Sequence, residues 1–449
     1  MLLKLCVENF KSFNEMVEFS MIESNKYRDK TDHKIKIKNV NVLKHAVIYG
    51  ANASGKSNLI EVFEFIRFCL LNRIPFSTQN SFCKILEENR HRPSKFEIHF
   101  SIKEKIYAYG FSAVLSNCHI LEEWLYELTS SANANMIFER RYGEEIEFGK
   151  TLKCDADEES RLKTYSRDFI QNKNCLFLSE MNRNKKFGDG SPLKIFNEVF
   201  TWLTQSIIVM TPNSWTTDFA YFDEGTTIEK VSKIISAFDT GISEAQFVEI
   251  SLDEMKKKVP EEVFNSMMDD INESTKDGEL KPFKVSLRSD CDFFVINFKS
   301  IDDYTIKTLS LKHGKSFFDF SFEEESDGTR RLFDMLDMLL LKREDVVFVV
   351  DELERSLHPK LTQMFLTLFS NIHTEIKTQL IFTTHESSIM DLELFRRDEF
   401  WFIERSEENA SSVYSLDMFK ERYDKKLRKA YLEGRYGAIP IFQNFNFED

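Results

Sequence analysis

Gly50-Ala51-Asn52-Ala53-Ser54-Gly55-Lys56-Ser57 is the stretch that decides the fold, because it matches G-x-x-x-x-G-K-[ST] at every fixed position. The apolar run 46–49 before it suits a buried strand, and residues 58–68 after it carry apolar side chains at helical spacing. The glycines let backbone N–H groups curl around a phosphate at a helix N-terminus, while Lys56 adds a positive charge and Ser57 a hydroxyl ligand for Mg²⁺. The stretch therefore predicts a phosphate-binding loop at a strand-to-helix turn.

Composition is that of a globular protein. The chain has 449 residues, of which 42% are hydrophobic, enough for a sizeable core and about two or three compact units. Its seven cysteines include no C-x-x-C pair, which argues against a zinc knuckle or a disulfide framework. The N-terminus lacks the apolar core of a signal peptide, and no apolar run approaches the roughly 18 residues of a membrane span. We therefore expect a cytoplasmic protein without a membrane partner.

The net charge of −14 makes the surface as a whole repel nucleic acid. DNA binding would need a local basic patch. The lysine-containing runs 34–38 and 256–258 are short, and such runs are usually solvated faces. DNA therefore stays an open candidate for a partner, and no motif in the sequence supports it directly.

The first third of the chain alternates apolar and polar residues. This alternation predicts a hairpin and then an antiparallel meander, with strands at 2–8, 16–22, 95–103, 105–115, 120–128 and 136–141. Residues 24–39 read as a polar loop. Longer amphipathic segments such as 192–208, 228–238 and 261–268 then predict a mainly helical subdomain over 155–310, with strand-like residues 285–287 and 293–298 near its end.

The last third alternates helices with buried strands. Helices are expected at 330–341 and 360–372, and buried strands at 346–350, 379–384 and 399–404. A charged helix near 419–433 should close the chain. The predicted fold is α/β: parts 1–154 and 311–449 form one P-loop nucleotide-binding domain with an antiparallel meander, and 155–310 is inserted between them.

Polar residues at strand ends form the candidate active site. Asp351 and Glu352 follow one buried strand, and His385 follows the next. Because parallel strands end at one edge of a sheet, these residues should converge with the phosphate loop. Asp351 would hold Mg²⁺, Glu352 would orient or deprotonate an attacking water, and His385 would touch the γ-phosphate. Upstream, Ser326 is a suitable N-cap for the helix that Ser326-Asp327-Gly328-Thr329 opens.

Together these motifs resemble those of ABC-class ATPases of the SMC/RecF/OLD-like group. Asn9-Phe10-Lys11-Ser12-Phe13 is similar to the group's N-terminal element, residues 50–57 to its Walker A, 326–329 to its signature loop, 346–352 to its Walker B, and His385 to its switch histidine. The resemblance implies an ATPase that uses ATP and Mg²⁺. Its implied site residues are Lys11, Ser12, Asn52, Gly55, Lys56, Ser57 and Asn58 for the nucleotide, Ser57 and Asp351 for the metal, Glu352 and His385 for catalysis, and Ser326, Asp327, Gly328 and Thr329 supplied by a second copy.

Within the group, residues 325–329, 351–359, 383–387 and 431–440 resemble stand-alone OLD-like ATPase subunits of prokaryotic anti-phage and abortive-infection systems, including those of PARIS type. The stretch after His385 is too short for the nuclease domain of OLD nucleases. The resemblance therefore implies a molecular switch that dimerises around ATP and controls a separately encoded effector, a nuclease or toxin.

Some points depart from the pattern or stay open. The usual signature is L-S-G-G-Q, whereas here Asp327 replaces the first glycine and Thr329 the glutamine. Gln79 and Gln171 are both candidates for the Q-loop glutamine. A RecF-like DNA-repair ATPase that binds duplex DNA is the alternative function, although the acidic balance and the tail resemblance argue against it. A small P-loop kinase does not fit residues 326–329, Glu352 and His385.

Overall fold

The computed structural model describes residues 1–129, 133–212, 228–265, 267–268, 283–288, 292–300, 303–341, 343–419 and 427–440. The chain divides into two compact units, which are described separately. Unit 1 comprises Met1–Val209, Arg343–Leu353 and His373–Asp449, and unit 2 comprises Met210–Lys342 and Glu354–Ile372. Among the described helices, none is both long and apolar enough to cross a membrane.

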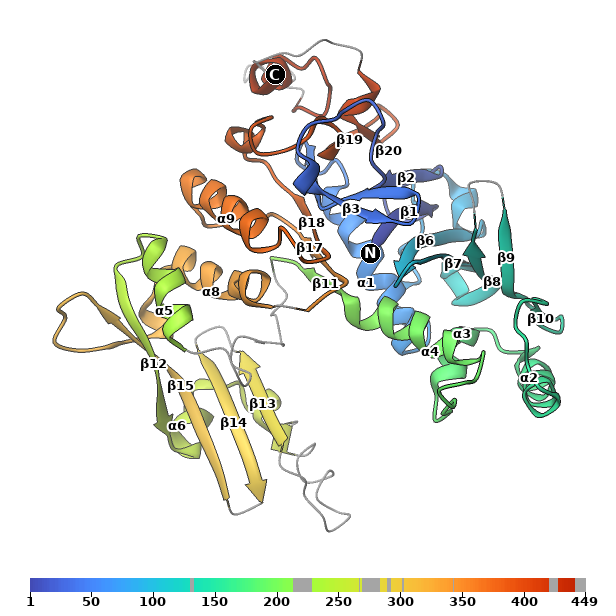
Figure 1. Cartoon of the computed structure of the whole chain (residues 1–449), viewed down its shortest axis with the longest axis horizontal. Helices are drawn as coiled ribbons and strands as arrows, with labels where there is room; N and C mark the ends of the chain where they lie inside the picture. The colour runs from blue at the N-terminus through green and yellow to red at the C-terminus, as the bar shows by residue number, and fades with distance from the viewer. Residues whose placement is uncertain are drawn as a thin grey trace, which may run out of the picture. The chain divides into compact units, whose positions relative to one another are not determined.

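Unit 1 contains a seven-stranded sheet in the order β10-β9-β8-β7-β6-β1-β2 (Figure 1). Every pairing in it is antiparallel, as the alternating sequence predicts. Its strands are β1 (Leu2–Glu8), β2 (Val17–Ser20), β6 (Ser94–Ile102), β7 (Lys105–Val114), β8 (His119–Leu128), β9 (Ala134–Arg141) and β10 (Glu147–Phe148). Phe96, Ile98 and Phe100 on β6 are buried while their neighbours Lys95, Glu97 and His99 are less so, so one face of the sheet covers the core.

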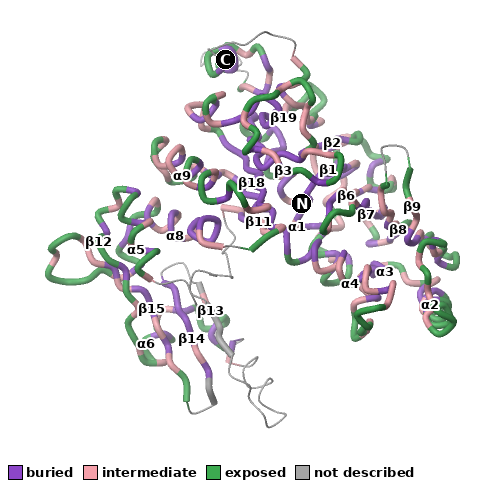
Figure 2. The backbone as a smooth tube through the Cα atoms, in the orientation of Figure 1, coloured by how far each residue is buried: buried purple, intermediate pink, exposed green. Residues whose placement is uncertain are grey.

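The second sheet of unit 1 has six strands in the order β11-β17-β18-β5-β19-β20. They are β5 (His45–Gly50), β11 (Ile207–Met210), β17 (Val346–Val350), β18 (Thr378–Thr383), β19 (Phe400–Arg405) and β20 (Ser411–Ser415). The pairs β17–β18, β18–β5 and β5–β19 are parallel. Every residue of β5, β17 and β18 is buried, as Figure 2 shows for β18. This confirms the buried parallel strands predicted from their continuous apolar runs.

Helices α2 to α4 pack on the seven-stranded sheet. Unit 1 has the helices α1 (Lys56–Leu71), α2 (Ala156–Phe169), α3 (Phe177–Asn182), α4 (Lys194–Thr201) and α10 (Leu427–Leu432), with a π-helical turn at Trp202–Ser206. The rings of Phe177 and Phe196 contact Phe138 on β9, and the buried Glu123 on β8 accepts hydrogen bonds from the N–H groups of Phe177 and Leu178. These contacts join α3 and α4 to the sheet, and unit 1 continues to Val209, beyond the expected boundary after residue 154.

The predicted polar loop 24–39 contains a strand. β3 (Lys34–Ile37) pairs with β4 (Val40–Leu43), and Ile35 and Ile37 are buried. The loop prediction is wrong here, because the Lys-Ile-Lys-Ile alternation is the period-two pattern of a half-buried strand. The run is therefore one strand of a hairpin, with its isoleucines buried and Lys36 and Lys38 exposed.

Unit 2 combines helices with an antiparallel sheet in the order β12-β15-β14-β13. Its strands are β12 (Ile242–Ile250), β13 (Phe283–Arg288), β14 (Phe293–Ser300), β15 (Asp303–His313) and β16 (Phe320–Ser321), and its helices include α5 (Ile228–Ala237), α6 (Leu252–Lys258), α8 (Asp327–Leu340) and α9 (Pro359–Ile372). The strand-like residues 285–287 and 293–298 lie in β13 and β14. The stretch 155–310 thus holds a sheet in addition to the expected helices.

The tail motif 431–440 is docked on β19 and β20. The ring of Tyr436 stacks on Phe402, and the hydroxyl of Tyr414 donates to the Tyr436 carbonyl at 2.7 Å. Gly437 has φ +67°, and a Cβ built there would lie 2.6 Å from the Tyr414 hydroxyl and 2.8 Å from the Glu404 carboxylate. Part of the predicted charged helix, 420–426, lies outside the described residues; the described part is α10.

We expect Gly437→Ala to destabilise unit 1 by about 2–4 kcal/mol, because the methyl group would meet two side chains in a left-handed backbone conformation. Gly188→Ala is the matched control, since a Cβ at Gly188 would meet nothing within 4 Å. Urea denaturation of both variants measures the difference. Equal unfolding midpoints would show that the tail is not docked in this way.

Candidate nucleotide-binding site

The phosphate loop joins the end of β5 to the start of α1. Gly55 has φ +108° and Ala53 φ +59°, so the loop uses two left-handed residues to turn into the helix. The buried Lys56 donates from Nζ to the carbonyls of Gly50 and Ala51, both at 3.0 Å. No side chain caps the N-terminus of α1. Its first N–H groups therefore suit an anion, and the lysine lies beside them.

Two serines from distant segments enclose Gly55. A Cβ built on Gly55 would lie 2.5 Å from the Ser411 hydroxyl and 2.6 Å from the Ser12 hydroxyl, so only glycine fits. The buried Ser411 donates from Oγ to the Ser54 carbonyl at 2.5 Å and from its N–H to the Ser12 carbonyl at 2.8 Å. Asn58 donates to Ser12 Oγ at 2.7 Å. Ser411 thus braces the loop, a role that sequence reasoning missed because a lone serine in a strand carries no motif.

Thr383 joins the carboxyl ends of β17 and β18. Its hydroxyl donates to Asp351 Oδ1 at 2.5 Å and accepts from the Glu352 N–H at 2.8 Å. Asp351 is buried, and Glu352 has a left-handed φ of +49°. The Thr383 hydroxyl thus supplies a hydrogen bond that the buried Asp351 carboxylate needs, and it holds Glu352 in its left-handed backbone conformation.

The strand order of the sheet brings the predicted residues of unit 1 to one edge. Asp351 and Glu352 follow β17, His385 follows the neighbouring β18, and the phosphate loop follows β5, which pairs with β18. Asn52, Ser57 and His385 are exposed there, whereas Lys56 and Asp351 are buried. The edge therefore presents a cation, a helix N-terminus, two carboxylates and an imidazole.

Carboxylates on α1 add to the electrostatics of this edge. Lys11 pairs with Glu61. Burial lowers the pKa of Lys11, and Glu64 opposes that shift. Burial raises the pKa of Glu64; Lys11 opposes this shift, and Asp351 adds to it. Glu64 therefore interacts electrostatically with both Lys11 and Asp351. The sequence did not indicate this role, because Glu64 lies in an ordinary amphipathic helix.

A pocket of about 650 Å³ lies beside the loop. It is lined by Lys11, Ser12, Asn58, Asn80, Ser81, Phe82, Lys84, Ile85, Glu408 and Asn409. Its size falls within the range that binds small ligands. Three of the residues predicted to contact nucleotide, Lys11, Ser12 and Asn58, thus share one concave surface next to the phosphate loop.

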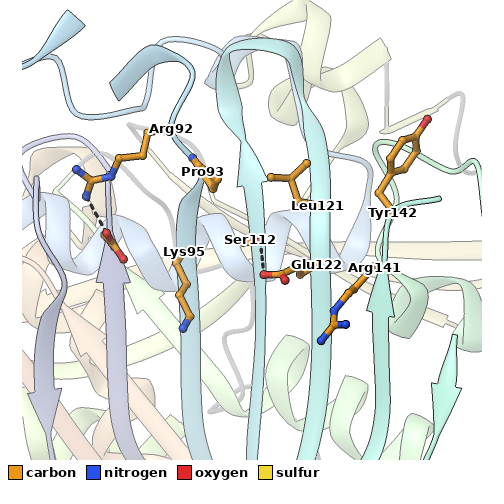
Figure 3. A pocket seen from close by; sticks show the side chains of 9 residues that line it. Arg92, Pro93, Lys95, Ser112, Leu121, Glu122, Arg141 and Tyr142 are labelled. Atoms are coloured by element: carbon orange, nitrogen blue, oxygen red, sulfur yellow. Dashed lines mark hydrogen bonds and ion pairs between the residues drawn. The ribbon is translucent and has the colours of Figure 1, made fainter. Parts of the chain in front are cut away.

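A second pocket, of about 580 Å³, lies over strands of the seven-stranded sheet (Figure 3). Its cations are partly neutralised: Arg92 donates to Glu8 at 2.7 Å, and Glu122 lines the same surface. The described residues that line it include no glycine and no N-terminus of a long helix. We therefore do not assign phosphate binding to it.

The signature residues belong to unit 2. Ser326 caps α8 by accepting from the Thr329 N–H at 3.2 Å, and Asp327 pairs with Arg330 at 2.5 Å. A Cβ built on Gly328 would lie 2.7 Å from the Ser356 carbonyl, so the start of α8 packs tightly against the segment that follows Glu352 in sequence. The predicted N-cap is confirmed.

A family described as "AAA domain, putative AbiEii toxin, Type IV TA system" matches residues 46–162 and 232–391, more than half of the chain. These ranges contain the phosphate loop, the signature residues, Asp351, Glu352 and His385. Lys11, Ser12 and Ser411 lie outside them. No curated protein matches the chain.

The solved structures that this chain matches include SMC head domains. The SMC head bound to the C-winged helix domain of ScpA has a TM-score of 0.43 at 13% identity, covering 92% of this chain and 97% of that chain. The SMC head domain from Thermotoga maritima has a TM-score of 0.37 at 12% identity, and the match covers 92% of this chain and 98% of that chain. A third match is the Smc head domain with an extended coiled coil bound to the C-terminal domain of ScpA, derived from Pyrococcus furiosus. Its TM-score is 0.37 at 14% identity, and the match covers 97% of this chain and 99% of that chain.

We expect Ser411→Ala to weaken ATP binding about three- to tenfold, because the buried hydrogen bond that braces the loop is worth about 0.5–1.5 kcal/mol. Ser412→Ala is the control, since Ser412 is exposed and its hydroxyl makes a long 3.4 Å contact with the Glu404 carbonyl. Titration with a fluorescent ATP analogue compares the two variants. The same affinity in both would mean that Ser411 does not shape the loop.

Proposed function

We propose that this chain, which belongs to the AAA-domain family that its sequence matches, is an ATP-driven molecular switch. Membership of the family indicates nucleotide-binding ATPase activity. The observation that carries the proposal is the shared sheet edge at which β5, β17 and β18 deliver the phosphate loop, Asp351–Glu352 and His385. This set supplies each group that phosphoryl transfer to water requires.

Each residue has a proposed role. Lys56 and the first N–H groups of α1 bind the β- and γ-phosphates, with Gly55 leaving room for their approach. Glu352 orients or deprotonates the attacking water, and His385 contacts the γ-phosphate. The buried Asp351 carboxylate and the Ser57 hydroxyl are hard oxygen ligands of the kind that Mg²⁺ prefers. The ion, when bound, would neutralise charge that develops on the phosphate oxygens.

We also propose that two copies of the chain dimerise around ATP. The Ser326–Thr329 loop of one copy would then complete the nucleotide site of the other. At the start of α8 the Thr329 N–H is bonded to Ser326, whereas the Gly328 N–H and the Ser326 hydroxyl are donors of the kind that a γ-phosphate accepts. We further propose that the dimer controls a separately encoded effector in prokaryotic anti-phage defence. The family description, which names a putative toxin of a type IV toxin–antitoxin system, supports a defence role, and so does the resemblance of residues 351–359 and 431–440 to OLD-like subunits of PARIS-type systems.

Two substitutions separate binding from hydrolysis. Lys56→Ala should weaken ATP binding at least about tenfold, because charge-assisted hydrogen bonds to the phosphates are lost. Glu352→Gln should keep the affinity and slow hydrolysis about 10²–10⁴-fold, since an amide cannot accept the water's proton. Equilibrium binding and single-turnover hydrolysis measure both. Wild-type turnover in Glu352→Gln would assign the base elsewhere.

Mixing two inactive variants tests whether the site is shared. Lys56→Ala and Ser326→Arg protomers should each lack ATPase activity, whereas their heterodimer would hold one intact composite site. The mixture should therefore recover part of the wild-type rate. No recovery in a mixture shown by native mass spectrometry to contain heterodimers would count against sharing.

The effector role is tested with the genomic neighbour. Glu352→Gln, which would hold ATP, should co-purify with the neighbouring gene product to a different extent from Lys56→Ala, because a switch needs different affinities for its partner in its two states. Equal co-purification of the neighbour in every nucleotide state, or none in any, would contradict the switch. ATPase activity stimulated by duplex DNA would favour the RecF-like alternative instead.

A further inference from the structure

Three buried side chains from separate segments of unit 1 meet at the opposite end of β5 from the phosphate loop. His33 ends the 3₁₀ turn Thr31–His33, His45 begins β5, and Glu399 ends the 3₁₀ turn Arg397–Glu399 just before β19. Their exposed fractions are 5%, 2% and 0%. Nothing in the nucleotide chemistry uses them.

The geometry of these three residues is that of a ligand set. His33 Nδ1 lies 2.9 Å from Glu399 Oε2, and His45 Nδ1 lies 3.2 Å from Glu399 Oε1. One ligand atom from each residue falls within 4.8 Å of the others. Ligands of a tetrahedral zinc ion, at bond lengths of about 2.0–2.2 Å, are about 3.3–3.6 Å apart. The two nitrogen–oxygen distances are therefore a few tenths of an ångström shorter than in such a site, and all three ligand atoms lie within the 4.8 Å that a shared ion can bridge after small shifts.

The charge of the surroundings also favours a cation. The guanidinium of the nearby Arg396 pairs with Asp398 at 2.9 Å and with Glu23 at 3.2 Å. The backbone N–H of Arg396 donates to the Glu399 carboxylate at 2.7 Å. Lys34 pairs with Glu23. Among the described residues, the ion pairs of Glu399 are therefore those with the two imidazoles. A buried carboxylate requires a compensating positive charge, which an imidazolium or a metal ion can supply.

We propose that His33, His45 and Glu399 bind a divalent transition-metal ion of the zinc class, with water as a fourth ligand. Two imidazoles and a carboxylate are a ligand set that zinc takes with its fourth position open to water, and the burial of all three side chains screens the ion from bulk solvent. Each ring would coordinate through Nδ1 and keep its proton on Nε2. The ion would clamp the start of β5 to the turn before β19, the two paired strands that lead to the phosphate loop and to the Ser411 hairpin.

The experiment measures metal in the full-length chain after removal of any affinity tag. Inductively coupled plasma mass spectrometry of protein loaded with Zn²⁺ and then desalted should give about one ion per chain for the wild type and less than about 0.1 for His33→Gln and Glu399→Gln. Protein stripped of metal and loaded with Co²⁺ should show the visible absorption of a tetrahedral site. Zn²⁺ should raise the Tm of the stripped wild type by about 3 °C or more.

His99→Gln is the matched control, because His99 also contacts a carboxylate, Glu97 at 2.9 Å, but the described residues supply no third ligand beside this pair. It should bind metal like the wild type. The Co²⁺ spectrum of the wild type decides the matter even if a variant fails to fold. Stripped wild type that takes up no Zn²⁺ and shows no Co²⁺ bands would overturn the proposal, and the cluster would then be a hydrogen-bonded imidazolium–carboxylate triad.

Discussion

The parallel pairing of β18 with β17 and β5 is the interaction on which the rest of unit 1 depends. Val350 pairs with Phe382, and Thr383 with Ile48, so the three strands end within a residue or two of one another. Since all three are buried along their length, a slip in register would carry Asp351 into the apolar layer, where its charge would have no hydrogen-bonding partner. The Thr383 hydroxyl satisfies that carboxylate only in the observed register.

Local patterns allowed most of this architecture to be predicted. The G-x-x-x-x-G-K-S stretch gave the phosphate loop, because each of its fixed residues is needed for the turn, and the apolar runs gave β17 and β18. Long-range bonds could not be predicted. Ser411 and Thr383 act through contacts with Ser54 and Asp351, hundreds or tens of residues away in sequence, and a single hydroxyl carries no periodicity. The buried His33 and His45 were missed for the same reason.

The signature loop shows how a departure from a motif is accommodated locally. Thr329, in place of glutamine, gives its N–H to the Ser326 cap, and its hydroxyl contacts Ser326 Oγ at 3.0 Å. Asp327, in place of glycine, pairs with Arg330 and puts a negative charge at the start of α8, which the helix dipole favours. Both changes stabilise the first turn of α8. Gly328 stays glycine because the Ser356 carbonyl leaves no room for a side chain.

The central claim is that nucleotide binds at the carboxyl edge of the six-stranded sheet, and hydrogen–deuterium exchange tests it most directly. With Mg²⁺ and a non-hydrolysable ATP analogue at saturation, exchange should slow in peptides covering 50–58, 351–353, 383–386 and 411–413. Peptides of the pocket in Figure 3, around 92–95 and 121–142, should not change. Protection confined to that pocket, or none at any of these peptides, would contradict the account.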